Sequence, residues 1–185
     1  MRSLFYEPGR IGNVEIRNRL VMGPAGFGFC DETEGRVNDK AIEFFRQRAR
    51  GGVGLIDIGA LQIDPALYTN YDMLKIFDDC YIPDLRRLTD AIHAEGAKVM
   101  GQLLHQGRYC ASRQYDGKIG VAPSAVFARY TGETPRELSL AECEQLVRQY
   151  GLAAARAVKA GFDAVEICTN SGYLIGQFLS PVTNL

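Results

Sequence analysis

The sequence predicts an α/β fold of repeated βα units around a parallel sheet. Short apolar runs alternate along the chain with longer amphipathic stretches, which is the pattern of strands joined by crossover helices. Hydrophobic residues make up 46% and charged residues 23% of the chain, as in an ordinary globular domain. The 185 residues suit one domain but are too few for a complete eight-fold βα barrel, which needs about 250.

Four strands are expected in order, each ending where polar or small residues begin. They cover residues 19–25, 53–60, 98–104 and 163–169, and their mostly apolar sequences are typical of strands buried on both faces. A small hairpin over residues 9–18, with Gly12-Asn13 at its turn, precedes them. Residues 106–137 form a long connection without a clear period, which is typical of a binding loop or lid.

Three long helices are marked by capping signals. The signals are Asn38 before a helix that ends near Arg50, Pro83 at the start of a helix that ends at Gly96, and a Ser139–Glu142 capping box before a helix that reaches about Ala160. A short helix over residues 173–179 follows the fourth strand and ends before Pro181.

Charge and cysteine content exclude several classes of protein. The formal net charge of −1 gives no reason to expect a nucleic-acid or acidic-membrane partner. No run approaches 18 apolar residues, and the first eight residues lack the apolar core of a signal peptide, so we expect a cytoplasmic protein. The five cysteines are odd in number and none are at C-x-x-C spacing, which argues against a disulfide framework and against a metal site.

Polar side chains follow the third and fourth strands, at the ends that build the active site of a closed βα barrel. Gln102 offers a donor and an acceptor, so it suits the pyrimidine edge of a flavin; bracing a loop is the alternative. Tyr173 could donate a proton to a developing carbanion, or it could be a packed aromatic. For His105 a structural role is favoured over a catalytic one, and His93 is expected on a solvated helix face.

Other candidates have two interpretations each. Cys168 is either a thiol beside a cofactor or, the favoured reading, a small buried residue, and Cys30 could face the same end of the sheet. Arg108 and Arg113 either steer an anionic substrate or are solvated. The sequence has no G-x-G-x-x-G, P-loop or G-x-S-x-G motif and no strand-end lysine placed for a Schiff base, so dinucleotide-fold, hydrolase and aldolase chemistries lack support.

Four segments resemble the old yellow enzyme, or NADH:flavin oxidoreductase, family. They are residues 11–24, residues 48–56, the Q-L-L-H-Q-G-R motif at 102–108, and the block over 161–184 that contains G-F-D-A-V-E-I and G-Y-L-I-G-Q-F-L-S-P-V-T-N. The resemblance covers nearly the whole chain. It implies the N-terminal half of a (βα)8 TIM barrel, strands one to four preceded by the small hairpin, with residues 1–185 forming a partial FMN-binding domain.

The resemblance also implies an activity. Family members bind FMN at the barrel mouth, accept hydride from NADH or NADPH, and pass it to an activated alkene such as an enoate, an enone or a 2,4-dienoyl-CoA. Carried over to this sequence, the flavin-binding positions are Pro24, Ala25, Gly26, Ala60 and Gln102. Tyr173 matches the family tyrosine that donates the proton.

One departure from the family pattern concerns the substrate. Many members carry a His-x-x-His or His-x-x-Asn pair after the fourth strand that grips a substrate carbonyl, and here Cys168 and Ser171 occupy those positions. The sequence is therefore more similar to the branch of the 2,4-dienoyl-CoA reductases. Members of that branch carry an iron–sulfur cluster and FAD further along the chain, so those groups are expected only in a full-length parent.

The alternative to an enzyme is a non-catalytic half-barrel that acts as an assembly or interaction module. Strands one and four would have open edges, and unpaired edges favour association, including homo-oligomers. Barrel phosphate sites commonly use loops after strands seven and eight, so these 185 residues are expected to bind FMN weakly or not at all.

Overall fold

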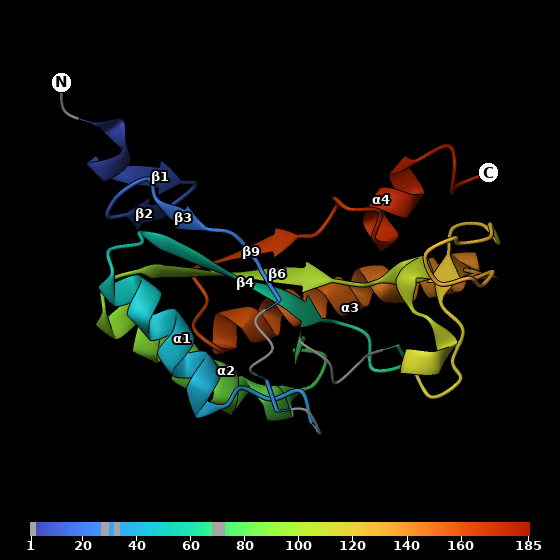
Figure 1. Ribbon diagram of the computed structural model, residues 1–185, viewed down its shortest axis with the longest axis horizontal. Coiled ribbons are helices and arrows are strands. Elements are labelled where there is room, and N and C mark those ends of the chain that lie inside the picture. Colours follow the sequence, from blue (N-terminus) through green and yellow to red (C-terminus); the bar gives the residue numbers. More distant parts are fainter. Residues whose placement is uncertain (1–2, 27–29, 32–33, 68–72) are drawn as a thin grey trace.

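A parallel sheet of five strands forms the centre of the chain (Figure 1). The computed structural model describes residues 3–26, 30–31, 34–67 and 73–185. The strands are β3 (Val21–Met22), β4 (Leu55–Gln62), β5 (Leu74–Lys75), β6 (Lys98–Leu104) and β9 (Ala164–Ile167). Their order is β3-β4-β6-β9, with β5 paired to the end of β4. Four strands thus lie side by side in chain order, as in the first half of a βα barrel.

Three long helices cover one face of this sheet. They are α1 (Asp39–Arg50), α2 (Ile82–Ala94) and α3 (Leu140–Lys159). Their apolar sides meet the outward side chains of β4 and β6 in one core that includes Phe45, Ile56, Ile58, Leu88, Val99, Leu103 and Ala157. No helix in the described part of the chain is long and apolar enough to cross a membrane.

The helix boundaries agree with the capping signals. The Asn38 side chain accepts a hydrogen bond of 2.9 Å from the backbone N–H of Ala41 and begins α1. Ser139 and Glu142 form the predicted capping box of α3, and Glu142 also pairs with Arg136 at 2.7 Å. Local signals of this kind need no knowledge of the tertiary fold, which explains why they locate the helices well.

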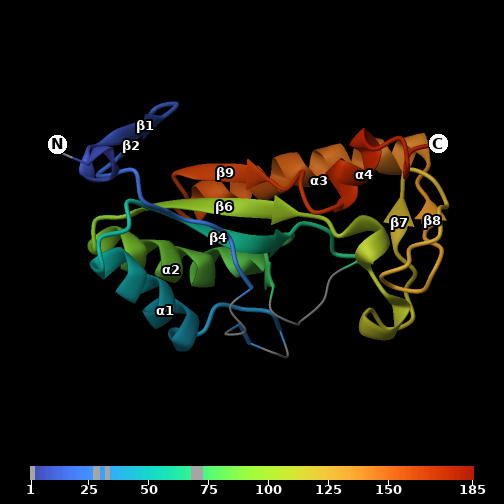
Figure 2. The same cartoon turned by 45° about the horizontal axis from the view of Figure 1, so that its top comes forward.

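The two ends of the sheet differ in what covers them (Figure 2). The hairpin of β1 (Gly9–Ile11) and β2 (Val14–Ile16) lies near the end where the strands begin, as predicted. The short helix α4 (Leu174–Leu179) and the long connection lie at the opposite end, where the strands finish. The second end is therefore the one with elaborated loops.

The strands differ in length from those expected. The predicted strand over 19–25 contains only the two residues of β3, and the strand over 163–169 is reduced to β9. The strand expected over 53–60 begins and ends two residues later, as β4. The β5 pair was not predicted, because two residues carry no readable period. Among the described residues, both outer strands pair on one side only.

The long connection contains local structure that the sequence did not reveal. It holds two 3₁₀ turns, η3 (Gly107–Tyr109) and η4 (Ser112–Gln114), and a short parallel pair, β7 (Val121–Ala122) with β8 (Arg136–Glu137). A second correction concerns His93, which was expected on a solvated face. It is partly buried, and its Nε2 lies 2.7 Å from Oδ2 of Asp163.

Candidate functional site

A pocket of about 360 Å³ lies where the central strands end. That volume falls within the range of small-molecule sites. Its wall consists of Pro24, Ala25, Gly26, Gly59, Ala60, Met73, Gln102, Leu104, Cys168, Asn170, Ser171 and Tyr173. All eight of the site residues named from the sequence are in this wall, although they come from four separate parts of the chain.

A bulge in β4 shapes one side of the pocket. The register between β4 and β6 shifts between Ile58 and Leu61, so Gly59 and Ala60 leave the regular ladder. A Cβ atom on Gly59 would lie 2.6 Å from Cβ of Pro24 and 2.8 Å from Oε1 of Gln102. Only glycine lets these three elements approach so closely.

Gln102 lies on the inner face of the sheet, opposite the helices. Its neighbours Gly101 and Leu103 point to the helical side, and alternation along the strand turns Gln102 the other way. The β6–β9 register places it beside Glu166, and its Nε2 donates to Oε1 of Glu166 at 3.2 Å. Its Oε1 lies beside Gly59, at the pocket wall.

Asp57 is a buried acid beneath this pocket that sequence reasoning missed. The side chain alternates with the core residues Ile56 and Ile58, so it also lies on the inner face, and the residue is only 2% exposed. Within the described structure its Oδ1 has no hydrogen-bond partner. Burial and a hydrogen bond with Glu166 raise the pKa of Asp57 to about 8.

Tyr173 is presented to the pocket by a turn with left-handed backbone. Ser171 and Gly172 have φ angles of 54° and 73°, and Tyr173 then begins α4 as its N-cap. The ring of Tyr109 packs edge-on at 5.8 Å between centroids. Burial, with smaller contributions from Cys168 and two neighbouring tyrosines, raises the pKa of Tyr173, so the phenol keeps its proton.

Cys168 is a buried thiol in the pocket wall. Its Sγ lies 3.5 Å from Oδ1 of Asn170, to which it donates. Burial raises its pKa, as do the carboxyl groups of Glu166 and Asp57, while a backbone hydrogen bond at Asn170 opposes them. The thiol is thus kept protonated, which agrees with the favoured sequence interpretation of a small buried residue.

Gln177 on α4 joins the loops that follow β6 and β9. It is 1% exposed, and its Nε2 donates to the carbonyls of Gly172 at 2.7 Å and Gln106 at 3.3 Å. Its Oε1 accepts from the backbone N–H of Arg108 at 3.1 Å. Sequence reasoning gave this residue no role, although it stands within the Q-F-L-S-P part of the family block.

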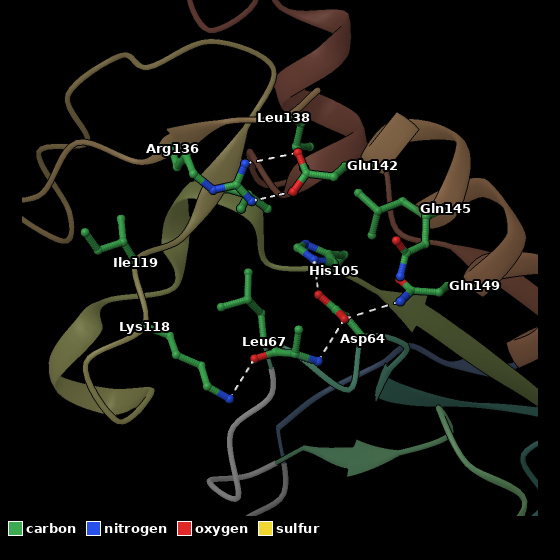
Figure 3. A pocket seen from close by; sticks show the side chains of 13 residues that line it. Asp64, Leu67, His105, Lys118, Ile119, Arg136, Leu138, Glu142, Gln145 and Gln149 are labelled. Carbon is green, nitrogen blue, oxygen red and sulfur yellow. Dashed lines mark hydrogen bonds and ion pairs between the residues drawn. The ribbon is translucent and has the colours of Figure 1, made fainter. Parts of the chain in front are cut away.

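A second pocket, of about 300 Å³, lies between the long connection and α3 (Figure 3). At its base, Nε2 of His105 lies 3.1 Å from Oδ2 of Asp64, and Nδ1 accepts from the backbone N–H of Gly107 at 3.0 Å. Burial opposes ionisation of Asp64, but hydrogen bonds from His105 and Ala66 prevail and lower its pKa. This bonding supports the structural role that was favoured for His105.

Three other candidates do not reach the first pocket. Cys30 belongs to the apolar core, bridged to Val37, so it does not face the strand ends as considered from the sequence. Arg108 donates to the carbonyl of Phe127 at 2.8 Å, and Arg113 donates to that of Thr131 at 3.2 Å. Both arginines therefore stabilise the long connection through hydrogen bonds to its backbone.

The fold and this pocket together define half of a βα barrel with a pocket lined from the ends of its first four strands. Residues 3–185 match the model of the NADH:flavin oxidoreductase / NADH oxidase family, so the chain belongs to that family, the old yellow enzyme family. Membership implies FMN and a nicotinamide donor.

Curated relatives support the assignment. The chain is 47% identical over 182 residues to a metal reductase of Desulforamulus reducens and 42% identical over 183 residues to an NADH oxidase of Thermoanaerobacter brockii. It covers 27% and 28% of those proteins, and 98% of it is aligned in each case. It is 36% identical to an NADPH dehydrogenase of a Geobacillus species and spans 53% of that protein.

Solved structures show the same half-barrel. A morphinone reductase in complex with tetrahydroNAD aligns with a TM-score of 0.89 at 30% identity, covering 99% of this chain and 54% of the reductase. A 2-naphthoyl-CoA reductase in complex with 2-naphthoyl-CoA aligns with a TM-score of 0.89 at 34% identity, covering 98% of this chain and 29% of that protein. The predicted fold, the N-terminal half of a TIM barrel, is confirmed.

Gly59 provides a test of the pocket packing. Gly59→Ala should lower the free energy of unfolding by about 1–3 kcal/mol, because the added methyl group forces Pro24 and Gln102 apart. The matched control is Gly23→Ala, since a Cβ at Gly23 meets no atom within 4 Å. Urea denaturation of both variants measures the difference, and equal stability would contradict this account of the wall.

Proposed function

We propose that this chain supplies the flavin-ring contacts and the proton donor of an FMN-dependent oxidoreductase that reduces activated C=C bonds with NADH or NADPH. One observation carries the proposal: the residues that the family resemblance singles out at four separate strand ends meet in a single pocket. The chain spans about half of the shorter relatives and little more than a quarter of the longer ones.

The pocket fits a flavin ring by shape and by chemistry. Pro24, Ala25, Gly26 and Ala60 give a wall of small side chains, and Gln102 adds an amide with a donor and an acceptor. Bound FMN supplies a reversible hydride carrier. The residues of this chain hold the ring edge, exclude water from one side of it and keep Gln102 beside the bulge.

Tyr173 is proposed as the proton donor. Its pKa is raised, so the phenol is protonated at neutral pH, and the turn over Ser171 and Gly172 presents it from a different strand than Gln102. Tyr173 would then donate a proton to the substrate while Gln102 holds the cofactor, so different residues carry out the two tasks. General acid catalysis of this kind contributes typically about 10²–10⁴-fold in rate.

The proposed substrate is a conjugated acyl-CoA thioester or a related enone. Cys168 is a protonated thiol and Ser171 a small hydroxyl, so the usual imidazole clamp for a carbonyl is missing from these positions. Identity is also higher to the long metal reductase and NADH oxidase than to the shorter NADPH dehydrogenase. We therefore favour the 2,4-dienoyl-CoA reductase-like branch, with its iron–sulfur cluster and FAD in the whole protein.

Replacing the phenol tests the proton-donor role. In the intact, FMN-loaded enzyme, Tyr173→Phe should leave reduction of the flavin by NADH or NADPH unchanged and slow alkene reduction by about 10²-fold or more. Anaerobic stopped-flow measurement of the two half-reactions separates these effects, with 2-cyclohexenone and a 2,4-dienoyl-CoA as oxidants. Tyr109→Phe is the control because Tyr109 packs against Tyr173. Unchanged rates in both half-reactions would leave Tyr173 a packing residue only.

The 185-residue polypeptide should bind FMN weakly. Its pocket contacts the ring, whereas barrel phosphate sites commonly use loops after strands seven and eight. Titration of the polypeptide with FMN, followed by flavin fluorescence, should give no saturation at micromolar concentration. Tight stoichiometric quenching would overturn this expectation.

A second proposal is that the polypeptide associates through its sheet edges. The outer strands expose apolar side chains: Val21 on β3 is 51% exposed, and Ile167 on β9 is 50% exposed. Sedimentation velocity should show concentration-dependent association that Ile167→Lys weakens. Leu4→Lys, at an exposed position outside the sheet, should not. A monomer at every concentration would eliminate this proposal.

A further inference from the structure

Two carboxyl groups meet on the inner face of the sheet below the proposed flavin pocket. Asp57 comes from β4 and Glu166 from β9, and the two are close enough to hydrogen bond to each other. Glu166 also accepts from Nε2 of Gln102 at 3.2 Å. A chain of contacts therefore runs from Asp57 through Glu166 to Gln102, whose other amide atom lies at the pocket wall.

Asp57 is an unusual residue for the middle of a buried strand. It is 2% exposed, and in the described structure its Oδ1 has no partner. An ionised carboxylate in that position would be uncompensated, and two like charges in contact cannot both ionise readily. The pair therefore keeps a proton where isolated carboxyl groups would have none.

Few other groups act on this pair. Burial and Glu166 are the causes of the raised pKa of Asp57. Cys168, directly after β9, is the further titratable neighbour, and its thiol is protonated, since burial and both carboxyl groups raise its pKa. β6 contributes the neutral Gln102. In the described part of the chain, then, no cationic side chain lowers the pKa of Asp57.

We propose that Asp57 and Glu166 share one proton and together act as a positioning pair that fixes the Gln102 carboxamide. The shared proton lies between the two acids, so Glu166 presents an oxygen acceptor to Nε2 of Gln102. The Gln102 Oε1 is then directed to the pocket, ready to accept from an N–H group of a flavin ring. This inference rests on the proposed function for its flavin, but the proton sharing itself does not.

The orientation depends on the protonation state in a definite direction. With one proton in the pair, Glu166 accepts, and the amide has one favoured orientation. When acid adds a second proton, Glu166 becomes a donor, and the amide turns over to offer it Oε1 instead. As the pH rises through about 8, the pair loses its last proton, and the two adjacent negative charges then repel each other.

The first experiment needs no flavin. Carboxyl ¹³C and side-chain amide ¹⁵N resonances of the 185-residue protein are followed from about pH 4 to about pH 10. We expect two coupled steps for the acids, the upper one near pH 8, and movement of the Gln102 amide with both. In Asp57→Asn, the step near pH 8 should vanish from both the carboxyl and the Gln102 amide resonances. The matched control is Asp90→Asn, an exposed acid on α2, which should retain both steps.

Two results would overturn the proposal. If Asp57 of the unaltered protein ionises fully below about pH 6, no proton is shared. If the acids titrate in coupled steps but the Gln102 amide does not respond, the pair does not position it. Should Asp57→Asn fail to fold, the unaltered protein alone still decides between these outcomes.

The second experiment tests whether the Asp57–Glu166 pair affects flavin binding. In the intact enzyme, Glu166→Gln removes the fixed acceptor, so FMN affinity at neutral pH should fall about tenfold, and the absorption spectrum of bound FMN should change. Glu166→Asp, which keeps the acid, should restore part of the loss. Unchanged FMN affinity in Glu166→Gln would contradict the link to the ring. If the intact enzyme and its variants bind no FMN, the flavin-ring role of the chain fails while the proton sharing is still judged by the first experiment.

Discussion

The parallel register of β4, β6 and β9 is the constraint on which the pocket depends. Parallel strands bring their carboxyl ends to one edge of the sheet, and the side chains of paired residues share a face. Gln102 and Glu166 meet because the β6–β9 ladder pairs them, although 64 positions separate them in the chain. The bulge at Gly59 then interrupts the β4–β6 ladder where the wall must approach Pro24. Regular pairing gathers the residues, and one local irregularity shapes the cavity they enclose.

A buried amide on α4 links the loops that follow β6 and β9. Gln177 satisfies both of its side-chain functions with backbone groups that follow β6 and β9, and Gly107, with φ of 62°, leaves the space its side chain fills. Buried polar groups of this kind are costly unless every partner is present. The network therefore sets one geometry for the turn that carries Tyr173. Tyr173 is thus presented by a turn that Gln177 ties to the loop after β6.

Local signals in the sequence were sufficient for the helices and, through family motifs, for most of the pocket wall. The cap at Asn38 and the capping box at Ser139 act within one turn, so they can be read without tertiary knowledge. The two-residue strands β5, β7 and β8 could not be read, because their pairing is non-local. Asp57 was missed for a related reason. Strands buried on both faces show no alternation, so the sequence does not tell which residues face inward.

The carboxyl pair of buried Asp57 and half-buried Glu166 makes physical sense only in relation to the pocket above it. A protonated carboxyl pair is a poor way to stabilise a fold, because replacing buried ionisable groups by apolar ones is often neutral or stabilising. Here, however, Glu166 is the one side-chain partner of Gln102 in the described structure, and an amide without a fixed partner can present either end to a ligand. A pair that keeps one proton also carries one negative charge rather than two beneath the proposed ring, which becomes electron-rich when reduced. Under the proposed function, the same two residues would orient the Gln102 amide and limit the electrostatic cost of a reduced flavin above it.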